Sequence, residues 1–119
     1  MLKNIIIADN NEACSKELAD FINTQPGMKV SSIANNGLKA LELINENMPD
    51  VLILEMLMPE LDGIGVLQKL NASGKKPLIL IYTLKLSPQA ADLVYKYGAD
   101  YIFIKPTPPE RIVEFLNSI

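Results

Sequence analysis

The stretch Asp50-Val-Leu-Ile-Leu-Glu-Met-Leu-Met-Pro-Glu-Leu-Asp-Gly63 decides how this chain folds. It begins with Val51 to Leu54, an unbroken run of branched apolar residues that is too short for a helix and typical of a strand buried on both faces. The run stops at Glu55, and Pro59, Asp62 and Gly63, which follow it, predict a loop. A charged side chain at the C-terminal end of a buried parallel strand lies where open α/β sheets place their chemistry. Glu55 is therefore the first candidate site residue; the alternative is a carboxylate that merely ends a strand.

Strand and helix signals alternate five times along the chain. Apolar runs at residues 4–8, 28–34, 51–54, 78–82 and 101–104 predict strands, and the second, with its serines, reads as a partly exposed edge. Each run is followed by apolar residues at helical spacing, which we expect to face the core: Cys14, Leu18, Phe21 and Ile22; Leu38, Leu41, Ile44 and Met48; Ile64, Leu67 and Leu70; Ala90, Leu93, Val94 and Tyr97; Ile112, Phe115, Leu116 and Ile119. This order predicts one α/β domain over residues 1–119, a parallel sheet covered on both faces by helices.

Four of the five predicted strands end at a polar residue: Asp9, Glu55, Thr83 and Lys105. The carboxyl ends of parallel strands lie at one edge of a sheet, so these four side chains can converge on one crevice. Four polar ends on otherwise apolar strands are not expected by chance. The pattern predicts a functional crevice at this edge.

The composition excludes several classes of protein. Hydrophobic residues make up 49% of the chain and charged residues 21%, a balance typical of a globular domain. The net charge of −3, with no cluster of Lys or Arg, argues against nucleic-acid binding by this domain, and no apolar run approaches the roughly 20 residues of a membrane helix. The chain has no histidine, which excludes a Ser-His or Cys-His hydrolase. The single Cys14 and the lack of a signal peptide predict a cytoplasmic protein.

Several motifs in sequence order make the whole chain resemble the receiver domain of two-component response regulators. They are Asp9 after the first strand, Met58-Pro59 and Asp62-Gly63 after the third, Thr83 after the fourth, and Gly98-Ala99 and Lys105-Pro106 around the fifth. The resemblance is strongest to the receiver of the sporulation transcription factor, stage-zero sporulation protein A. It implies a flavodoxin-like (βα)5 doubly wound sheet with strand order 2-1-3-4-5, phosphorelay signalling rather than enzymatic activity, and a C-terminal DNA-binding effector domain in a parent protein.

The resemblance also implies a chemistry. In receivers an aspartate at the end of the third strand, the position of Glu55, accepts a phosphoryl group from a histidine kinase or phosphotransferase. Mg²⁺ is held by that residue, by two acidic residues after the first strand and by a backbone carbonyl, which places Asp9, Asn10 and the carbonyl of Leu57 at the metal.

In the family, further residues respond to the phosphoryl group. A lysine, here Lys105, pairs with it, and a threonine hydroxyl, here Thr83, swings towards it. An aromatic residue on the fifth strand follows and alters the face made by that strand and the last two helices. The lysine–proline peptide is commonly cis in the family, so we expect a cis bond between Lys105 and Pro106.

The chain departs from the family pattern where this chemistry takes place. Glu55 replaces the acceptor aspartate, and Asn10 replaces the second acid, which removes a charge from a site for a hard cation. Leu84 follows Thr83 where a small residue is usual, and Ile102 stands where the switch aromatic is expected. We therefore expect Mg²⁺ to bind weakly or not at all.

The longer side chain of Glu55 has two consequences. It extends the carboxylate by about 1.5 Å, and a misplacement of about 1 Å can cost two orders of magnitude in rate. It also brings an anion towards Lys105 and Thr83, roughly where a phosphate would lie. The accumulated departures favour a degenerate, phosphorylation-independent receiver.

Two alternatives remain open. One is a working receiver with slow transfer to Glu55 or to another residue. The other is a small flavodoxin-like enzyme or nucleotide-binding protein, although Asp9-Asn10-Asn11 stands where a glycine-rich phosphate loop is needed. The expected partners are proteins (a histidine kinase, a phosphotransferase, the effector domain or a second copy), bound through the last two helices and the fifth strand.

Overall fold

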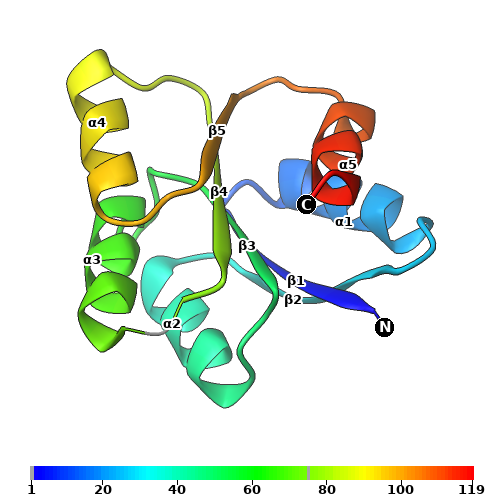
Figure 1. The fold of residues 1–119 in the computed structure, drawn as a ribbon, viewed down its shortest axis with the longest axis horizontal. Helices are drawn as coiled ribbons and strands as arrows, with labels where there is room; N and C mark the ends of the chain where they lie inside the picture. Colours follow the sequence, from blue (N-terminus) through cyan, green and yellow to red (C-terminus); the bar gives the residue numbers. More distant parts are fainter. Residues whose placement is uncertain (1, 75) are drawn as a thin grey trace.

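The computed structural model describes residues 2–74 and 76–119 and contains the expected alternation of strands and helices (Figure 1). The elements are β1 (Lys3–Ala8), α1 (Glu12–Asn23), β2 (Met28–Ala34), α2 (Gly37–Glu46), β3 (Val51–Leu54), α3 (Gly63–Ser73), β4 (Leu78–Thr83), α4 (Pro88–Lys96), β5 (Tyr101–Ile104) and α5 (Pro109–Asn117). The strands are all parallel and lie in the order β2-β1-β3-β4-β5, which confirms the flavodoxin-like fold. None of the helices described is long and apolar enough to cross a membrane.

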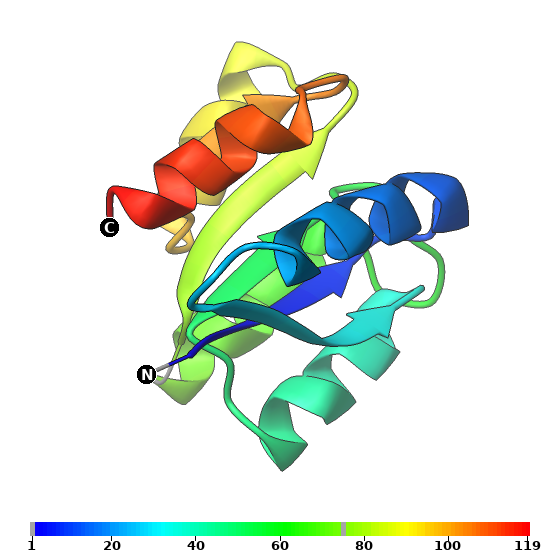
Figure 2. The same cartoon turned by 90° about the vertical axis from the view of Figure 1, so that its right-hand side faces the viewer.

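The sheet lies between two layers of helices. In Figure 1, α1 and α5 cover one face and α2, α3 and α4 cover the other; Figure 2 shows α1 and α5 from the side of their own layer. Each face has its own core, because successive residues of the central strands point to opposite sides. Leu52 and Leu54 of β3 pack towards α2 and α3, whereas Val51 and Ile53 pack towards α1 and α5.

The first four helices begin close to the C-terminal edge of the sheet, and each is capped by a side chain. Asn11, Asn36, Asp62 and Ser87 each accept a hydrogen bond from the backbone N–H three residues later, at 2.7 to 3.1 Å. Such caps satisfy the free N–H groups of the first turn and fix where the helix starts. The turns that carry the candidate site residues are therefore short and anchored.

Four apolar residues expected in the core lie at the surface. Leu38, Met48, Leu93 and Ile119 are 36–53% exposed. Met48 and Ile119 follow the last residues of α2 and α5, so they lie beyond the helical stripes. In α4 the buried residue is Val94, and Leu93, immediately before it, lies on a more exposed part of the helix.

Leu38 is exposed because the buried stripe of α2 runs through Gly37, Ala40 and Ile44. Gly37 approaches the loop before α3 so closely that a Cβ there would lie 1.9 Å from the carbonyl oxygen of Leu61. The first turn of α2 therefore turns Gly37 rather than Leu38 towards the core, and only a glycine fits at position 37.

This orientation of α2 can be tested with two substitutions on the same helix. Ile44→Ala removes a fully buried side chain and should lower the free energy of unfolding by about 2–5 kcal/mol. Leu38→Ala removes a side chain that is 53% exposed and should change it by no more than about 0.5 kcal/mol. Urea denaturation measures both, and equal losses would contradict the placement of this helix.

Candidate functional site

Four polar side chains meet at the C-terminal edge of the sheet. Asp9 and Glu55 directly follow β1 and β3, Thr83 ends β4 and Lys105 follows β5. All four are nearly buried: Asp9, Glu55 and Thr83 are 4%, 7% and 1% exposed, and the Lys105 side chain 8%. The Lys105 Nζ donates hydrogen bonds to Asp9 Oδ2 at 2.7 Å and to Glu55 Oε1 at 2.9 Å. One ammonium therefore lies between two carboxylates.

The second oxygen of Glu55 is engaged as well. Its Oε2 accepts hydrogen bonds from the Thr83 hydroxyl and from the backbone N–H of Met56, the latter at 2.6 Å. The N–H of Leu57 lies farther away, at 3.4 Å. The glutamate thus reaches both Thr83 and Lys105, as its extra methylene led us to expect.

The backbone around Glu55 is held in place from two sides. Its N–H donates to the carbonyl of Ala8 at 2.9 Å, and the following loop turns back so that the N–H of Gly63 donates to the carbonyl of Met56 at 2.8 Å. A Cβ at position 63 would lie 2.7 Å from the Glu55 carbonyl oxygen, so the close return of this loop requires glycine. The carboxylate is therefore presented from a rigid strand end.

The site carries one more negative than positive charge. Burial disfavours the ammonium and lowers the pKa of Lys105, but the hydrogen bonds and charges of Asp9 and Glu55 more than offset this effect. The pKa of Lys105 consequently lies above its ordinary value, and the lysine remains a cation under all physiological conditions.

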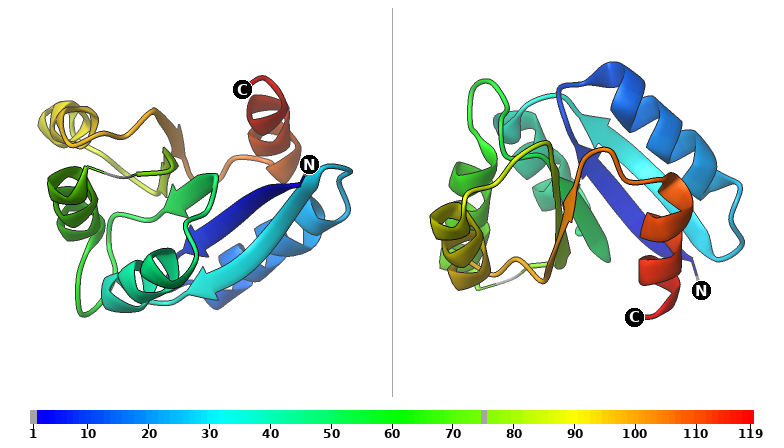
Figure 3. Two further views of the ribbon diagram at one scale, coloured as in Figure 1. Left: turned by 60° about the horizontal axis from the view of Figure 1, so that its bottom comes forward. Right: turned by 90° about the horizontal axis from the view of Figure 1, so that it is seen from above.

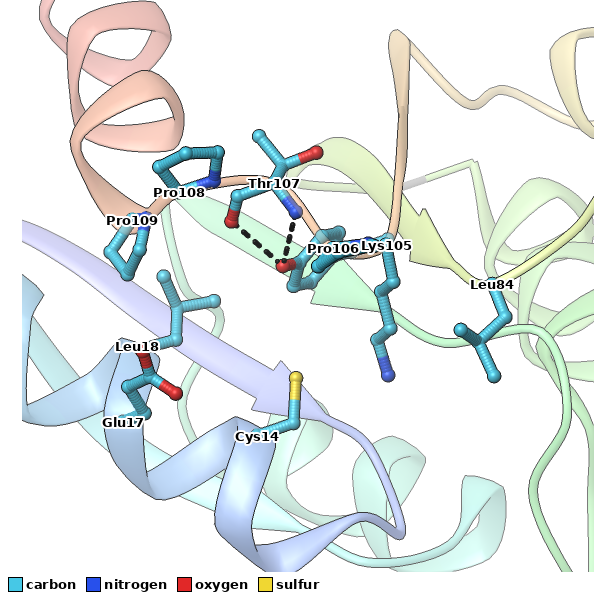
Figure 4. A pocket seen from close by; sticks show the side chains of 10 residues that line it. Cys14, Glu17, Leu18, Leu84, Lys105, Pro106, Thr107, Pro108 and Pro109 are labelled. Atoms are coloured by element: carbon cyan, nitrogen blue, oxygen red, sulfur yellow. Dashed lines mark hydrogen bonds between the residues drawn. The ribbon is translucent and has the colours of Figure 1, made fainter.

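Tyr82 positions the segment that carries Lys105. Its hydroxyl donates to the carbonyl of Thr107 at 3.0 Å and accepts from the N–H of the same residue at 3.2 Å, as the dashed lines in Figure 4 show. The Lys105 Nζ lies 5.4 Å from the centre of the tyrosine ring. Burial raises the pKa of Tyr82, so the hydroxyl keeps its proton. The Lys105–Pro106 peptide within this segment is cis.

Tyr82 is a residue of the site that was not predicted from the sequence. The available signal was a hydroxyl on an otherwise apolar buried strand, which must find a hydrogen-bond partner. The sequence alone does not show that this partner is the backbone of Thr107.

A groove of about 540 Å³ opens beside the site (Figure 4). It lies between Cys14, Glu17 and Leu18 of α1 and the segment from Lys105 to Pro109, with Leu84 at its rim. Leu84 is 70% exposed. Burial raises the pKa of the Cys14 thiol, which favours its protonated form.

The other expected site residues lie at the margin of this cluster. Asn10 is exposed, and it is the N–H of Asn11 that donates to Asp9 Oδ1, at 2.9 Å. The side chain of Leu57 is 78% exposed. Ile102 is half-buried against the core under α3 and α4, with no aromatic ring at its position.

The donor groups of the site do not suit Mg²⁺ in this arrangement. Within the described part of the chain no three acidic, cysteine or histidine side chains gather around one point. Both oxygens of Asp9 and both of Glu55 already accept hydrogen bonds, and the Lys105 ammonium occupies the space between them. A divalent cation, which needs near-octahedral oxygen ligation, would have to replace hydrogen bonds that these oxygens already accept.

Comparison with known proteins identifies close structural relatives. The family model described as "Response regulator receiver domain" matches residues 5–117. The fold superposes with a TM-score of 0.91 on a DNA-binding response regulator of the LuxR family from Staphylococcus aureus, 26% identical over 98% of both chains. A TM-score of 0.91 is also found with the signal receiver domain of NarL from Mycobacterium tuberculosis, 21% identical over 98% of this chain and 94% of that one. The response regulator domain of CheB from Thermotoga maritima gives 0.85, at 26% identity over 99% and 93%.

Replacing Lys105 tests the charge balance. Lys105→Met leaves two buried carboxylates without a counterion and should lower the free energy of unfolding by about 3–5 kcal/mol at neutral pH. The deficit should shrink as the pH is lowered, because protonation removes the repulsion. In the unsubstituted protein the folded pKa of Lys105 is raised. Its contribution is therefore complete below about pH 10.4 and is lost only as the pH rises through the folded pKa.

Urea denaturation at several pH values measures this loss. Lys16→Met provides the matched control, because Lys16 forms a solvent-exposed ion pair with Asp20 at 2.9 Å and should contribute no more than about 1 kcal/mol. Equal effects of the two substitutions would contradict the buried network.

The role of the Tyr82 hydroxyl in holding Thr107 can be tested by removing it. Tyr82→Phe keeps the ring but removes both hydrogen bonds to Thr107, so we expect a loss of about 1–2 kcal/mol in the free energy of unfolding. The amide of Thr107 should also exchange its hydrogen faster in the variant. An unchanged exchange rate at Thr107 would show that the hydroxyl does not hold this segment.

Proposed function

The chain belongs to the response regulator receiver domain family, and from this premise we propose that Glu55 takes the place of the phosphorylated acceptor, so that the domain signals without phosphoryl transfer. The carboxylate of Glu55 contacts both the Thr83 hydroxyl and the Lys105 ammonium, the two groups that read the phosphate in receivers. This double contact is the observation on which the proposal rests. A permanent anion holds both groups in one arrangement at all times.

The same contacts work against phosphorylation. Both oxygens of Glu55 are engaged and the residue is only 7% exposed, so a phosphodonor would have to break a buried network before it reached a nucleophile. Receiver domains usually bind Mg²⁺ at this site, but here the lysine supplies the positive charge between the carboxylates. We infer that Mg²⁺ binds weakly at most.

The proposed role is that of an interaction module. Exposed apolar side chains on α4 and β5, namely Leu93, Tyr95, Tyr101 and Ile104, offer a surface for a kinase, a phosphotransferase or an attached effector domain. The motifs shared with the sporulation transcription factor, and the likeness to a DNA-binding regulator of the LuxR family, support transcriptional control as the output. A cytoplasmic location is consistent with this role.

Intact mass spectrometry after incubation with acetyl phosphate and Mg²⁺ tests the proposal. We expect no stoichiometric phosphoryl adduct under conditions that label a receiver with an acceptor aspartate, because Glu55 is misplaced and engaged. A full adduct that disappears in Glu55→Gln would overturn the proposal in favour of a working phosphoacceptor.

Variants that restore the family residues provide the positive control. Glu55→Asp alone should recover little labelling, whereas its combination with Asn10→Asp and Leu84→Ala should recover much more. The gains should be non-additive, because the three side chains act on one transition state. Full labelling by Glu55→Asp alone would show that Asn10 and Leu84 are neutral.

A further inference from the structure

The groove beside the site, between α1 and the segment from Lys105 to Pro109, is a second concave feature at this edge of the sheet. Its volume of about 540 Å³ lies within the roughly 300–1,000 Å³ that is typical of small-molecule sites. In the right-hand view of Figure 3 the segment runs beside α1 and then enters α5, which packs against the same helix. The groove therefore lies between parts of the fold that hold each other in place.

The wall formed by this segment is fixed before any ligand arrives. The Tyr82 hydroxyl donates one hydrogen bond to the backbone of Thr107 and accepts another from it, and the Thr107 hydroxyl donates to the carbonyl of Ile104 at 2.6 Å. The rings of Pro108 and Pro109 restrict the backbone that follows. A preformed wall reduces the conformational entropy that is lost on binding.

The surface of the groove is mainly apolar and rich in rings. Its apolar lining residues are Leu18, Tyr82, Leu84, Pro106, Pro108 and Pro109. Leu84 is 70% exposed, so covering it with an apolar group removes hydrocarbon surface from water. A flat aromatic ring gains a large contact area against such walls and has few rotatable bonds to immobilise.

Negative charge is concentrated at the same place. Glu17 lines the groove from α1, is exposed, and forms no ion pair with a lysine or arginine among the described residues. Figure 4 shows Glu17 across the groove from Pro109. The ammonium of Lys105 already pairs with Asp9 and Glu55, and these three groups together carry one negative charge. The groove therefore favours a cation.

We propose that the groove binds a small organic cation, in which a short alkyl chain joins an aromatic ring to an ammonium group. The ring packs against the proline rings and Leu84, and the ammonium pairs with the carboxylate of Glu17. The apolar walls supply most of the affinity, and the carboxylate selects the sign of the ligand's charge. The ligand pairs with neither carboxylate of the buried cluster, so the proposal does not depend on the role of Glu55.

Other occupants fit these features less well. An anion would be repelled by Glu17 and by the excess negative charge of the cluster. A neutral apolar ligand would leave the carboxylate of Glu17 without a partner. A protein partner would need much more surface than this groove provides, since specific protein interfaces bury about 1,200–2,000 Å². A small ligand with both a ring and a positive charge uses all the features of the groove.

Tryptamine is a suitable probe, because it combines an indole ring with an ammonium group. NMR titration of the full chain follows the backbone amide shifts and gives the dissociation constant. We expect saturable changes centred on Cys14, Leu84 and Thr107. Indole-3-propionate carries a carboxylate on the same ring and chain and should bind at least about fivefold more weakly. The ammonium compound n-butylamine has no ring and should also bind more weakly than tryptamine.

Two pairs of variants separate the contributions of charge and apolar contact. Glu17→Gln should weaken tryptamine binding by about three- to fivefold, whereas Glu12→Gln, the same change of charge on α1 outside the groove, should alter it by less than about twofold. Leu84→Ala should weaken binding by about two- to fivefold, whereas Leu38→Ala, at an exposed site on α2, should have no effect. All four side chains are exposed, and circular dichroism verifies that each variant is folded.

Tryptamine that causes no saturable shifts, or shifts centred outside the groove, would overturn the proposal. Equal affinities for tryptamine and indole-3-propionate would do the same, because charge would then not select the ligand. Equal losses in Glu17→Gln and Glu12→Gln would show only a general effect of net charge and would also contradict the site. A groove that responds to a phosphotransferase protein but not to tryptamine would belong to a protein partner instead. None of these measurements involves phosphoryl transfer, so their outcome is independent of the phosphorylation test.

Discussion

The arrangement of the site depends on one buried ammonium, that of Lys105, between the carboxylates of Asp9 and Glu55. Without this ammonium, the two buried carboxylates, which both lie within hydrogen-bond distance of it, would repel each other strongly. The lysine follows β5, whereas its partners follow β1 and β3, so the ion pairs connect strands that are not neighbours. Glu55 extends the network to β4 through Thr83. Tyr82 stabilises the network indirectly, because its hydroxyl is hydrogen-bonded to the backbone of Thr107 in the segment that carries Lys105.

Under the proposed function, the network would let a receiver keep its architecture without phosphoryl transfer. In a receiver that is phosphorylated reversibly, the positions of the threonine and the lysine depend on whether the phosphoryl group is present. In the proposed role, the carboxylate of Glu55 takes the place of that group, so the positions of Thr83 and Lys105 are set when the protein folds. Ile102, at the position where the resemblance predicts an aromatic residue, packs against the core under α4.

The sequence was sufficient for the fold class and for the meeting of the strand ends, because both follow from alternation and from parallel pairing. It could not show that Gly37 rather than Leu38 faces the core, since the contact between Gly37 and Leu61 joins residues far apart in the chain. It also could not show that one oxygen of Glu55 accepts a hydrogen bond from Thr83 and the other from Lys105, or that the Tyr82 hydroxyl is hydrogen-bonded to the backbone of Thr107. Such hydrogen bonds depend on distances of a few tenths of an ångström that residue patterns do not encode.

The claim that Glu55 holds the switch residues is tested most directly by comparing the backbone amide chemical shifts of the protein with those of Glu55→Gln. The carboxamide keeps the size of the side chain but cannot accept hydrogen bonds from Thr83 and Lys105 with both of its terminal atoms. Our account predicts changes at Thr83 and Lys105 that continue into β5, from Tyr101 to Ile104. Changes confined to Glu55 and the two residues after it would contradict the account, because they would show that the carboxylate does not control the switch positions.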